Sequence, residues 1–188
     1  ILIFASAPFV AILCLLIKFE DKGPILYKQL RNGFKGRGFN IYKLRTMKVD
    51  SEKFGPQWST NDDTRITRIG KIMRLTRLDE LPQLFSVLSG KMSLIGPRPE
   101  RPEFDLKLKK KIIFYEKRYD LKPGLSGWAQ VNYPYGASTI DSANKLSYDL
   151  FYIKNASIWL DLLIFFKTIK LIINAKGAKP LDNKNSNL

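Results

Sequence analysis

The 188-residue sequence contains no histidine and a single cysteine, Cys14. Without histidine the chain cannot form a Ser-His-Asp or Cys-His catalytic site, and it cannot bind zinc or haem through imidazole. A single cysteine excludes an intrachain disulfide and a metal site built from several cysteines. Catalysis by this chain must therefore use carboxylates, amines, guanidinium groups or hydroxyls, and the metal ion that suits such groups is a hard, oxygen-preferring cation.

Acidic residues are also scarce, because 17 aspartates and glutamates stand against 32 lysines and arginines, which leaves a net charge of +15. Such an excess indicates an anionic partner, which could be nucleic acid, an anionic membrane surface or a phosphate-rich substrate. The sequence shows no helix-turn-helix, RNA-recognition or zinc-finger pattern, so we expect no nucleic-acid partner. With 45% hydrophobic residues, the chain is long and apolar enough to fold as one domain with a buried core.

One long apolar segment covers residues 1–17 and is interrupted only by Ser6 and Pro8. A straight helix of this length spans roughly 25 Å, whereas the hydrocarbon core of a bilayer is about 30 Å thick. Pro8 would also remove a backbone donor and bend a helix. The residues leave three alternatives open: a truncated transmembrane helix, a bent helix that enters the membrane and returns, or a buried core helix. Because the sequence starts at Ile1 inside this segment, we expect the natural chain to begin further upstream.

Local patterns predict most of the remaining elements. They predict short strands at 25–29 and 39–47, a lysine-rich helix at 103–118, a turn entering a strand at 122–131, an amphipathic helix at 141–152 and a final helix from 157 to 175. Ser157 is a suitable cap for that final helix, and Gly177 is a suitable stop. The helix is almost wholly apolar, yet Asp161, Lys167 and Lys170 make a full membrane crossing costly. We therefore expect it to lie in the membrane interface or to pack in the core.

A basic series runs through residues 64–78, where every third residue is a cation: Arg65, Arg68, Lys71, Arg74 and Arg77. An isoleucine series follows the same spacing, so a helix would carry a basic stripe beside an apolar one. This pattern suits a solvated helix face and a helix that faces an anion equally well.

Asp79 and Glu80 follow this series and open a new helical segment with Pro82 in its first turn. A helix N-terminus favours negative charge, and the neighbouring cations help both carboxylates to stay ionised. Ionised carboxylates suit a nucleophile or a metal ligand, whereas the plainer alternative is a capping pair held by salt bridges. Further along, Arg98 lies between two prolines that stiffen its backbone, and this arrangement predisposes its guanidinium to bind phosphate.

Three segments in this order resemble the bacterial sugar transferases, which are monotopic polyprenyl-phosphate phosphoglycosyl transferases. The segments are RLTRLDELPQL (74–84), GKMSLIGPRPE (90–100) and KPGLSGWAQV (122–131), and the resemblance extends from Pro8 to Gly177. Such enzymes transfer a sugar 1-phosphate from a UDP-sugar to polyprenyl phosphate, usually undecaprenyl phosphate, and release UMP. The resemblance implies the first membrane step of exopolysaccharide, O-antigen, capsule or glycoprotein glycan assembly, on the cytoplasmic face of the bacterial inner membrane.

The resemblance also implies roles for individual residues. Asp79 would be the nucleophile that forms a covalent phosphosugar ester, and Glu80 would bind Mg²⁺. Asp149 would be a structural or site carboxylate. The implied substrate-binding residues are Lys43, Arg45, Arg74, Arg98 and Gln130. Phosphoryl transfer needs positioning and charge neutralisation more than acid–base groups, so a site without histidine is chemically feasible.

The fold implied by the resemblance is α+β, mostly helical with a small β element. Residues 1–22 would form a membrane-embedded re-entrant helix, residues 23–178 the catalytic domain with interfacial amphipathic helices, and residues 179–188 a polar tail. The expected partners are a UDP-sugar, polyprenyl phosphate and membrane lipids, and the sequence leaves open whether the chain forms a homo-oligomer. Residues 132–138 resemble exopolysaccharide-type members and favour a hexose 1-phosphate. The alternative is a non-catalytic membrane-surface scaffold that keeps the fold.

Overall fold

The structure is a computed structural model that describes residues 2–53, 55, 57, 63–134, 136 and 138–174. Its elements, with 3₁₀ helices written η, are α1 (Leu2–Glu20), β1 (Leu26–Asn32), η1 (Phe34–Gly36), β2 (Gly38–Leu44), α2 (Arg68–Thr76), η2 (Leu78–Gln83), α3 (Leu84–Leu88), β3 (Ser93–Ile95), α4 (Pro102–Lys111), η3 (Tyr115–Asp120), β4 (Gly124–Ser126), α5 (Trp128–Asn132), α6 (Thr139–Asn155) and α7 (Ile158–Ile173). This order confirms the predicted α+β fold, mostly helical with a small β element.

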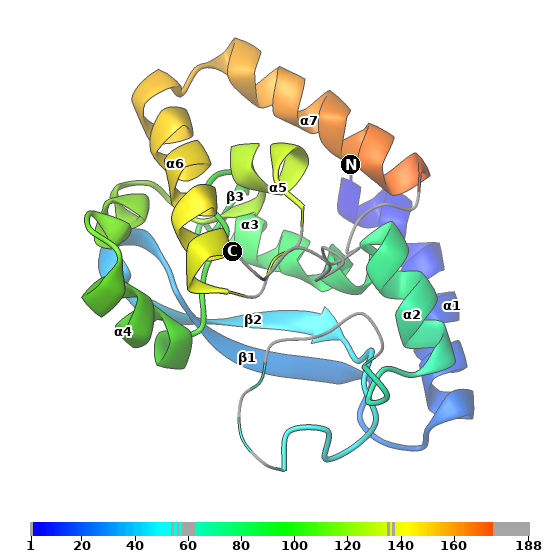
Figure 1. Ribbon diagram of the computed structural model, residues 1–188. Coiled ribbons are helices and arrows are strands. Elements are labelled where there is room, and N and C mark those ends of the chain that lie inside the picture. Colours follow the sequence, from blue (N-terminus) through cyan, green and yellow to red (C-terminus); the bar gives the residue numbers. More distant parts are fainter. Residues whose placement is uncertain are drawn as a thin grey trace.

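The β1–β2 hairpin crosses the lower half of the molecule in Figure 1, with α4 towards one end and α1 and α2 towards the other. The two strands pair antiparallel, and Lys43 lies directly opposite Tyr27. Because side chains alternate along a strand, Tyr27 and Arg31 of β1 share one face of the hairpin with Lys43 of β2. The second sheet is smaller, and in it β3 pairs parallel with β4.

A first core joins α1, β2 and α2 through Ile17, Leu44 and Met73, which are all buried. Polar contacts reinforce this junction, because the Glu20 carboxylate accepts hydrogen bonds from the backbone N–H groups of Arg68 (2.7 Å) and Ile69 (3.1 Å). These N–H groups belong to the first turn of α2 and have no partner within the helix. The last residue of α1 therefore stabilises the start of α2.

A second core joins α4, η3 and α6 through Leu108, Tyr115 and Leu146. The predicted helix at 103–118 is wrong in its second half, because α4 ends at Lys111 and η3 follows. Phe114, the residue before η3, has a left-handed backbone with φ of 61°. This break lets the Tyr115 ring turn into the second core, and burial of an aromatic ring outweighs the cost of one left-handed residue.

The prediction for residues 122–131 is correct only in part, because β4 covers three residues and the chain then enters α5. The change occurs at Gly127, where a Cβ atom would lie 2.1 Å from the Gly96 carbonyl oxygen. The helix predicted at 141–152 is confirmed within α6, which begins with a capping box between Ser138 and Asp141. Ser157 caps α7 as predicted, whereas the expected stop at Gly177 and the polar tail at 179–188 lie outside the described residues.

Pro8 lies inside α1, and the helix continues through it to Glu20. No helix within the described ranges has the combination of length and apolar composition that a membrane crossing needs.

The close approach of α2 to the chain after β2 yields a first prediction. A Cβ atom at Gly70 would lie 2.1 Å from the Thr46 carbonyl oxygen, so Gly70→Ala must push two backbones apart. We expect a loss of about 1–3 kcal/mol of stability, measured as a lower Tm in thermal unfolding. Gly38→Ala is the matched control, since its Cβ would meet only a Leu30 methyl group at 3.4 Å. Equal Tm values for the two variants would contradict this packing.

Candidate active site

Asp79 and Glu80 lie in the first turn of η2, directly after a sharp bend in the chain. Arg77 makes the bend with a left-handed backbone (φ 59°), and its N–H donates to the Met73 carbonyl at the end of α2. Both carboxylates are buried, with 7% of Asp79 and 6% of Glu80 exposed. A buried carboxylate needs cations or hydrogen-bond donors around it, because desolvation of an isolated charge is very unfavourable.

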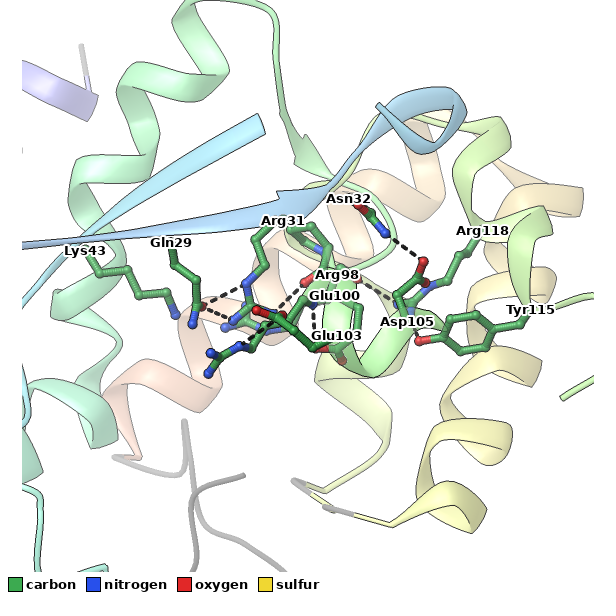
Figure 2. Close-up of polar contacts among 12 residues, drawn as sticks. Gln29, Arg31, Asn32, Lys43, Arg98, Glu100, Glu103, Asp105, Tyr115 and Arg118 are labelled. Atoms are coloured by element: carbon green, nitrogen blue, oxygen red, sulfur yellow. Dashed lines mark hydrogen bonds and ion pairs between the residues drawn. The ribbon is translucent and has the colours of Figure 1, made fainter. Parts of the chain in front are cut away.

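Three cations from three different segments surround Glu80. Lys43 of β2 donates to its Oε1 at 2.8 Å, and Arg98 contacts both carboxylate oxygens, with the Nη1–Oε2 distance at 3.2 Å. Arg77 lies 3.7 Å away. Figure 2 shows Lys43 and Arg98 near the hairpin, together with Arg31. β2, the residue before η2 and the loop after β3 thus form a cluster of cations around one glutamate.

The surroundings move the pKa values of the two acids in opposite directions. Burial raises the pKa of Asp79, and the negative charge of Glu80 adds to this effect against the opposing charge of Lys43. Burial would also raise the pKa of Glu80, but Arg98, Lys43 and Arg77 together hold it well below its usual range. Burial lowers the pKa of Lys43, although Glu80 opposes that shift. Glu80 is therefore the charged centre of the cluster, and Asp79 is its more basic neighbour.

Of the predicted binding residues, Lys43 and Arg98 contact Glu80 directly, and the positive charge of Arg74 acts on Asp79. Arg74 also donates to the Thr46 hydroxyl at 2.9 Å. The basic series on α2 is therefore divided, because Arg68 and Lys71 are exposed while later members turn towards the acids. The two alternatives for this series, a solvated helix face and a helix that faces an anion, therefore each describe a part of it.

Within the described residues, no hydrogen bond or ion pair joins Arg45 or Gln130 to Glu80. The Arg45 guanidinium donates to the Asp21 carboxylate, to the Asp21 carbonyl at 2.8 Å and to the Pro24 carbonyl. These hydrogen bonds connect the chain after β2 to the chain after α1. The Gln130 amide lies beside Gly127 and the Gly96 carbonyl. Its nitrogen and oxygen are buried and make no hydrogen bond within the described residues. Gln130 therefore lies near the loop that carries Arg98.

Sequence reasoning did not assign Arg77 and Arg31 to the site. Arg77 lies three residues before Glu80, a spacing that brings side chains together on a helix, but its left-handed backbone has no clear signal in the sequence. Arg31 donates to the Glu100 carboxylate at 3.2 Å and to the Pro99 carbonyl at 3.1 Å. In the sequence, Arg31 follows the strand predicted at 25–29, within a segment (29–31) that also resembles the family, but nothing there assigned it to the site.

Comparison with known proteins matches the sequence of this chain to a family. Residues 1–175 match the family described as bacterial sugar transferase. This chain belongs to that family. Its three shared segments contribute Glu80, Arg98 and the residues around Gly127, which the fold brings into one region.

Several named sugar transferases are similar to this chain. It is 47% identical over 173 residues to the UDP-N-acetylgalactosamine-undecaprenyl-phosphate N-acetylgalactosaminephosphotransferase of Aeromonas hydrophila, a match that covers 92% of the chain. It is 41% identical over 184 residues, 95% of the chain, to the undecaprenyl-phosphate glucose phosphotransferase of Komagataeibacter xylinus. It is 36% identical over 172 residues, 90% of the chain, to the UDP-glucose:undecaprenyl-phosphate glucose-1-phosphate transferase of Escherichia coli. The matches cover 41%, 35% and 37% of these relatives, respectively.

The cluster of cations around Glu80 yields a second prediction. Glu80→Gln leaves Lys43 and Arg98 without their shared carboxylate, and we expect a loss of about 3–5 kcal/mol of stability near neutral pH. Because the folded state lowers the pKa of Glu80, its stabilising effect is present above the ordinary glutamate pKa and is lost as the pH falls through the lowered value. The Tm difference from the wild type should therefore narrow in strong acid. Asp50→Asn, which breaks an exposed ion pair with Lys53, is the control and should change stability by less than about 1 kcal/mol.

Proposed function

We propose that this chain transfers a sugar 1-phosphate from a UDP-sugar to polyprenyl phosphate, in the form of undecaprenyl phosphate, and releases UMP. The observation that carries the proposal is the buried Asp79–Glu80 pair with a cluster of cations around it, in a chain without histidine. A cluster of this kind can neutralise the oxygens of a diphosphate, which is the main requirement for phosphoryl transfer. The names of the similar sugar transferases support the same reaction.

The proposed mechanism has two displacement steps. In the first, a carboxylate oxygen of Asp79 attacks the phosphorus that carries the sugar. The bond between that phosphorus and the bridging oxygen breaks, and UMP leaves with the electron pair. In the second, a phosphate oxygen of the polyprenyl phosphate attacks the aspartyl phosphosugar, and the Asp79 carboxylate is released. The raised pKa of Asp79 makes it a more basic nucleophile than an ordinary aspartate, while nearby Arg74 and Arg77 favour its ionised form.

The residues present fit a Mg²⁺ ion that is shared with the substrate. Mg²⁺ usually takes one or two carboxylates and completes its shell with phosphate oxygens and water. Within the described ranges, no group of three or more Asp, Glu, His or Cys side chains could hold a metal ion alone. Glu80 would supply the carboxylate once Arg98 and Lys43 have moved from it to the diphosphate. The ion would neutralise charge that develops on the phosphate oxygens, and Arg98 and Lys43 would orient the same group.

A membrane-facing side of the molecule is also part of the proposal, because the second substrate carries a long apolar chain. α1 exposes Phe4, Phe9 and Phe19, and α7 exposes Trp159 and Phe166. α7 contacts α2, which contacts α1 (Figure 1). Exposed aromatic and aliphatic side chains of this number are unusual on a surface in contact with water alone. We infer that α1 re-enters the cytoplasmic side of the bacterial inner membrane and that α7 lies in its interface.

The identity of the sugar depends on small contacts around the Asp79–Glu80 site. The relatives named above include both an N-acetylgalactosamine and a glucose phosphotransferase. The glucose enzymes agree with the hexose 1-phosphate favoured by residues 132–138, and we propose a product that begins an exopolysaccharide. A panel of UDP-sugars decides between these two classes.

The test of the proposed function is UMP release by the detergent-solubilised chain. With Mg²⁺, undecaprenyl phosphate and a panel containing UDP-glucose and UDP-N-acetylgalactosamine, we expect UMP from at least one donor. Asp79→Asn should lower the rate by about 10³-fold or more, since it removes the nucleophile, and chelation of Mg²⁺ should lower it as well. Asp50→Asn is the control that should keep the wild-type rate. Equal UMP release by the wild type and Asp79→Asn would contradict the mechanism, and no release from any donor would favour a non-catalytic scaffold.

A further inference from the structure

The loop that carries Arg98 is held by hydrogen bonds to its carbonyl groups. Pro97 and Pro99 have no N–H to donate, so the loop depends on donors from elsewhere. The Pro97 carbonyl accepts from the Gly124 N–H at 2.9 Å, and the Pro99 carbonyl accepts from Arg31 at 3.1 Å. Between them, the carbonyl of Arg98 itself accepts from Arg118 Nη2 at 2.7 Å. The backbone of Arg98 is therefore held by a side chain of η3.

Arg118 is fixed in turn by two buried partners. Its Nη2 also donates to Asp149 Oδ2 of α6 at 2.8 Å, and its Nη1 donates to the Tyr115 hydroxyl at 2.6 Å. Only 9% of Arg118 and 1% of Asp149 are exposed. Burial alone would lower the pKa of Arg118, but Asp149 keeps it above its usual value. Figure 2 shows Arg118 and Tyr115 on one side of Arg98, with Lys43 and Arg31 on the other.

Stability alone is a weak reason for this buried pair. A buried Arg–Asp pair usually adds little stability compared with a well-packed apolar pair, because both charges lose their hydration. Burial indeed raises the pKa of Asp149 to about 6 in spite of Arg118. The pair does provide direction, because a guanidinium is planar and its N–H groups point in fixed directions. With Asp149 and Tyr115 holding the guanidinium, one donor is aimed at the Arg98 carbonyl.

We propose that Arg118 and Asp149 are positioning residues for Arg98. They hold the Arg98 backbone so that its guanidinium reaches Glu80 in the free protein and the sugar diphosphate during the reaction. This inference rests on the proposed function for its effect on turnover. Neither residue contacts Glu80 or Asp79 through a described hydrogen bond or ion pair, and both act through the Arg98 carbonyl. Displacement of a binding group by about 1 Å can lower a rate by about 10²-fold, so loss of this contact should reduce catalysis.

A double-mutant cycle tests the proposal with the full chain in detergent. One arm is the paired variant Arg118→Met with Asp149→Leu, which removes both charges and leaves no unpaired buried ion. The other arm is Arg98→Lys, which keeps a cation and a measurable rate of UMP release. We expect the paired variant to lower kcat/KM by about 10–100-fold in the wild-type background. In the Arg98→Lys background, the paired variant should lower kcat/KM by less than about threefold, because the Arg98 guanidinium that it positions has already been replaced.

Tyr152→Phe is the matched control on α6. It removes another largely buried hydrogen bond of this helix, from the Tyr152 hydroxyl to Asp161 at 2.8 Å. Tyr152→Phe should change kcat/KM by the same factor in the wild-type and Arg98→Lys backgrounds, as expected for a residue that does not act through Arg98. An equal factor for the paired variant in both backgrounds would overturn the proposal, because it would show a general effect on the fold.

Two further measurements keep the test decisive. If the paired variant does not fold, Arg118→Lys takes its place, since a lysine keeps the charge beside Asp149 but loses the guanidinium fork. Arg118→Lys should then lower kcat/KM by a smaller factor in the Arg98→Lys background than in the wild-type background. An equal factor in both backgrounds would overturn the proposal. The Arg98–Glu80 ion pair also exists without substrate, so the same double-mutant cycle can be measured on Tm instead of kcat/KM. Absence of UMP release would contradict only the proposed function. Additive changes in Tm would overturn the positioning role of Arg118 and Asp149.

Discussion

The burial of the Glu80 carboxylate is the constraint on which the rest of this structure depends. An ionised carboxylate with 6% of its surface exposed is tolerable only because Lys43, Arg98 and Arg77 lie around it. These cations come from a hairpin strand, a rigid loop and the bend before η2, so the fold has to bring three distant segments together. The same cations are the groups that a diphosphate would use. In the proposed function, folding and substrate binding would use the same cations, because the diphosphate would bind the groups that pair with Glu80 in the free protein.

Two cores keep this arrangement in place from opposite ends of the hairpin. At one end, α1, β2 and α2 pack together, and Glu20 and Asp21 at the end of α1 bind the start of α2 and Arg45. The apolar helix is therefore joined to the same frame that presents Asp79. At the other end, α6 and η3 hold the Arg98 loop through Arg118. In the proposed function, this connection would join the helix that we propose to face the membrane to the site that binds the water-soluble donor.

The acidic pair, the arginine between two prolines and the main helices could be predicted from the sequence, because they depend on local spacing and on segments shared with the family. Contacts that depend on the residue at which a helix or strand ends could not be predicted from the sequence. Lys43 and Arg45 would share one face of a strand extending to residue 47, but β2 ends at Leu44, and Arg45 turns towards α1 instead. Arg118 looked like one more cation of a lysine-rich helix. Its role became visible only through the left-handed Phe114, which breaks that helix.

The central claim is that Asp79 forms a covalent bond with the sugar phosphate, and intact-protein mass spectrometry tests it most directly. The detergent-solubilised chain is mixed with Mg²⁺ and each UDP-sugar in turn, without polyprenyl phosphate. The account predicts that the wild type gains the mass of one sugar phosphate with its preferred donor, and that Asp79→Asn gains none. An unchanged wild-type mass, together with UMP release that begins only when polyprenyl phosphate is added, would show direct attack by the lipid phosphate and contradict the account.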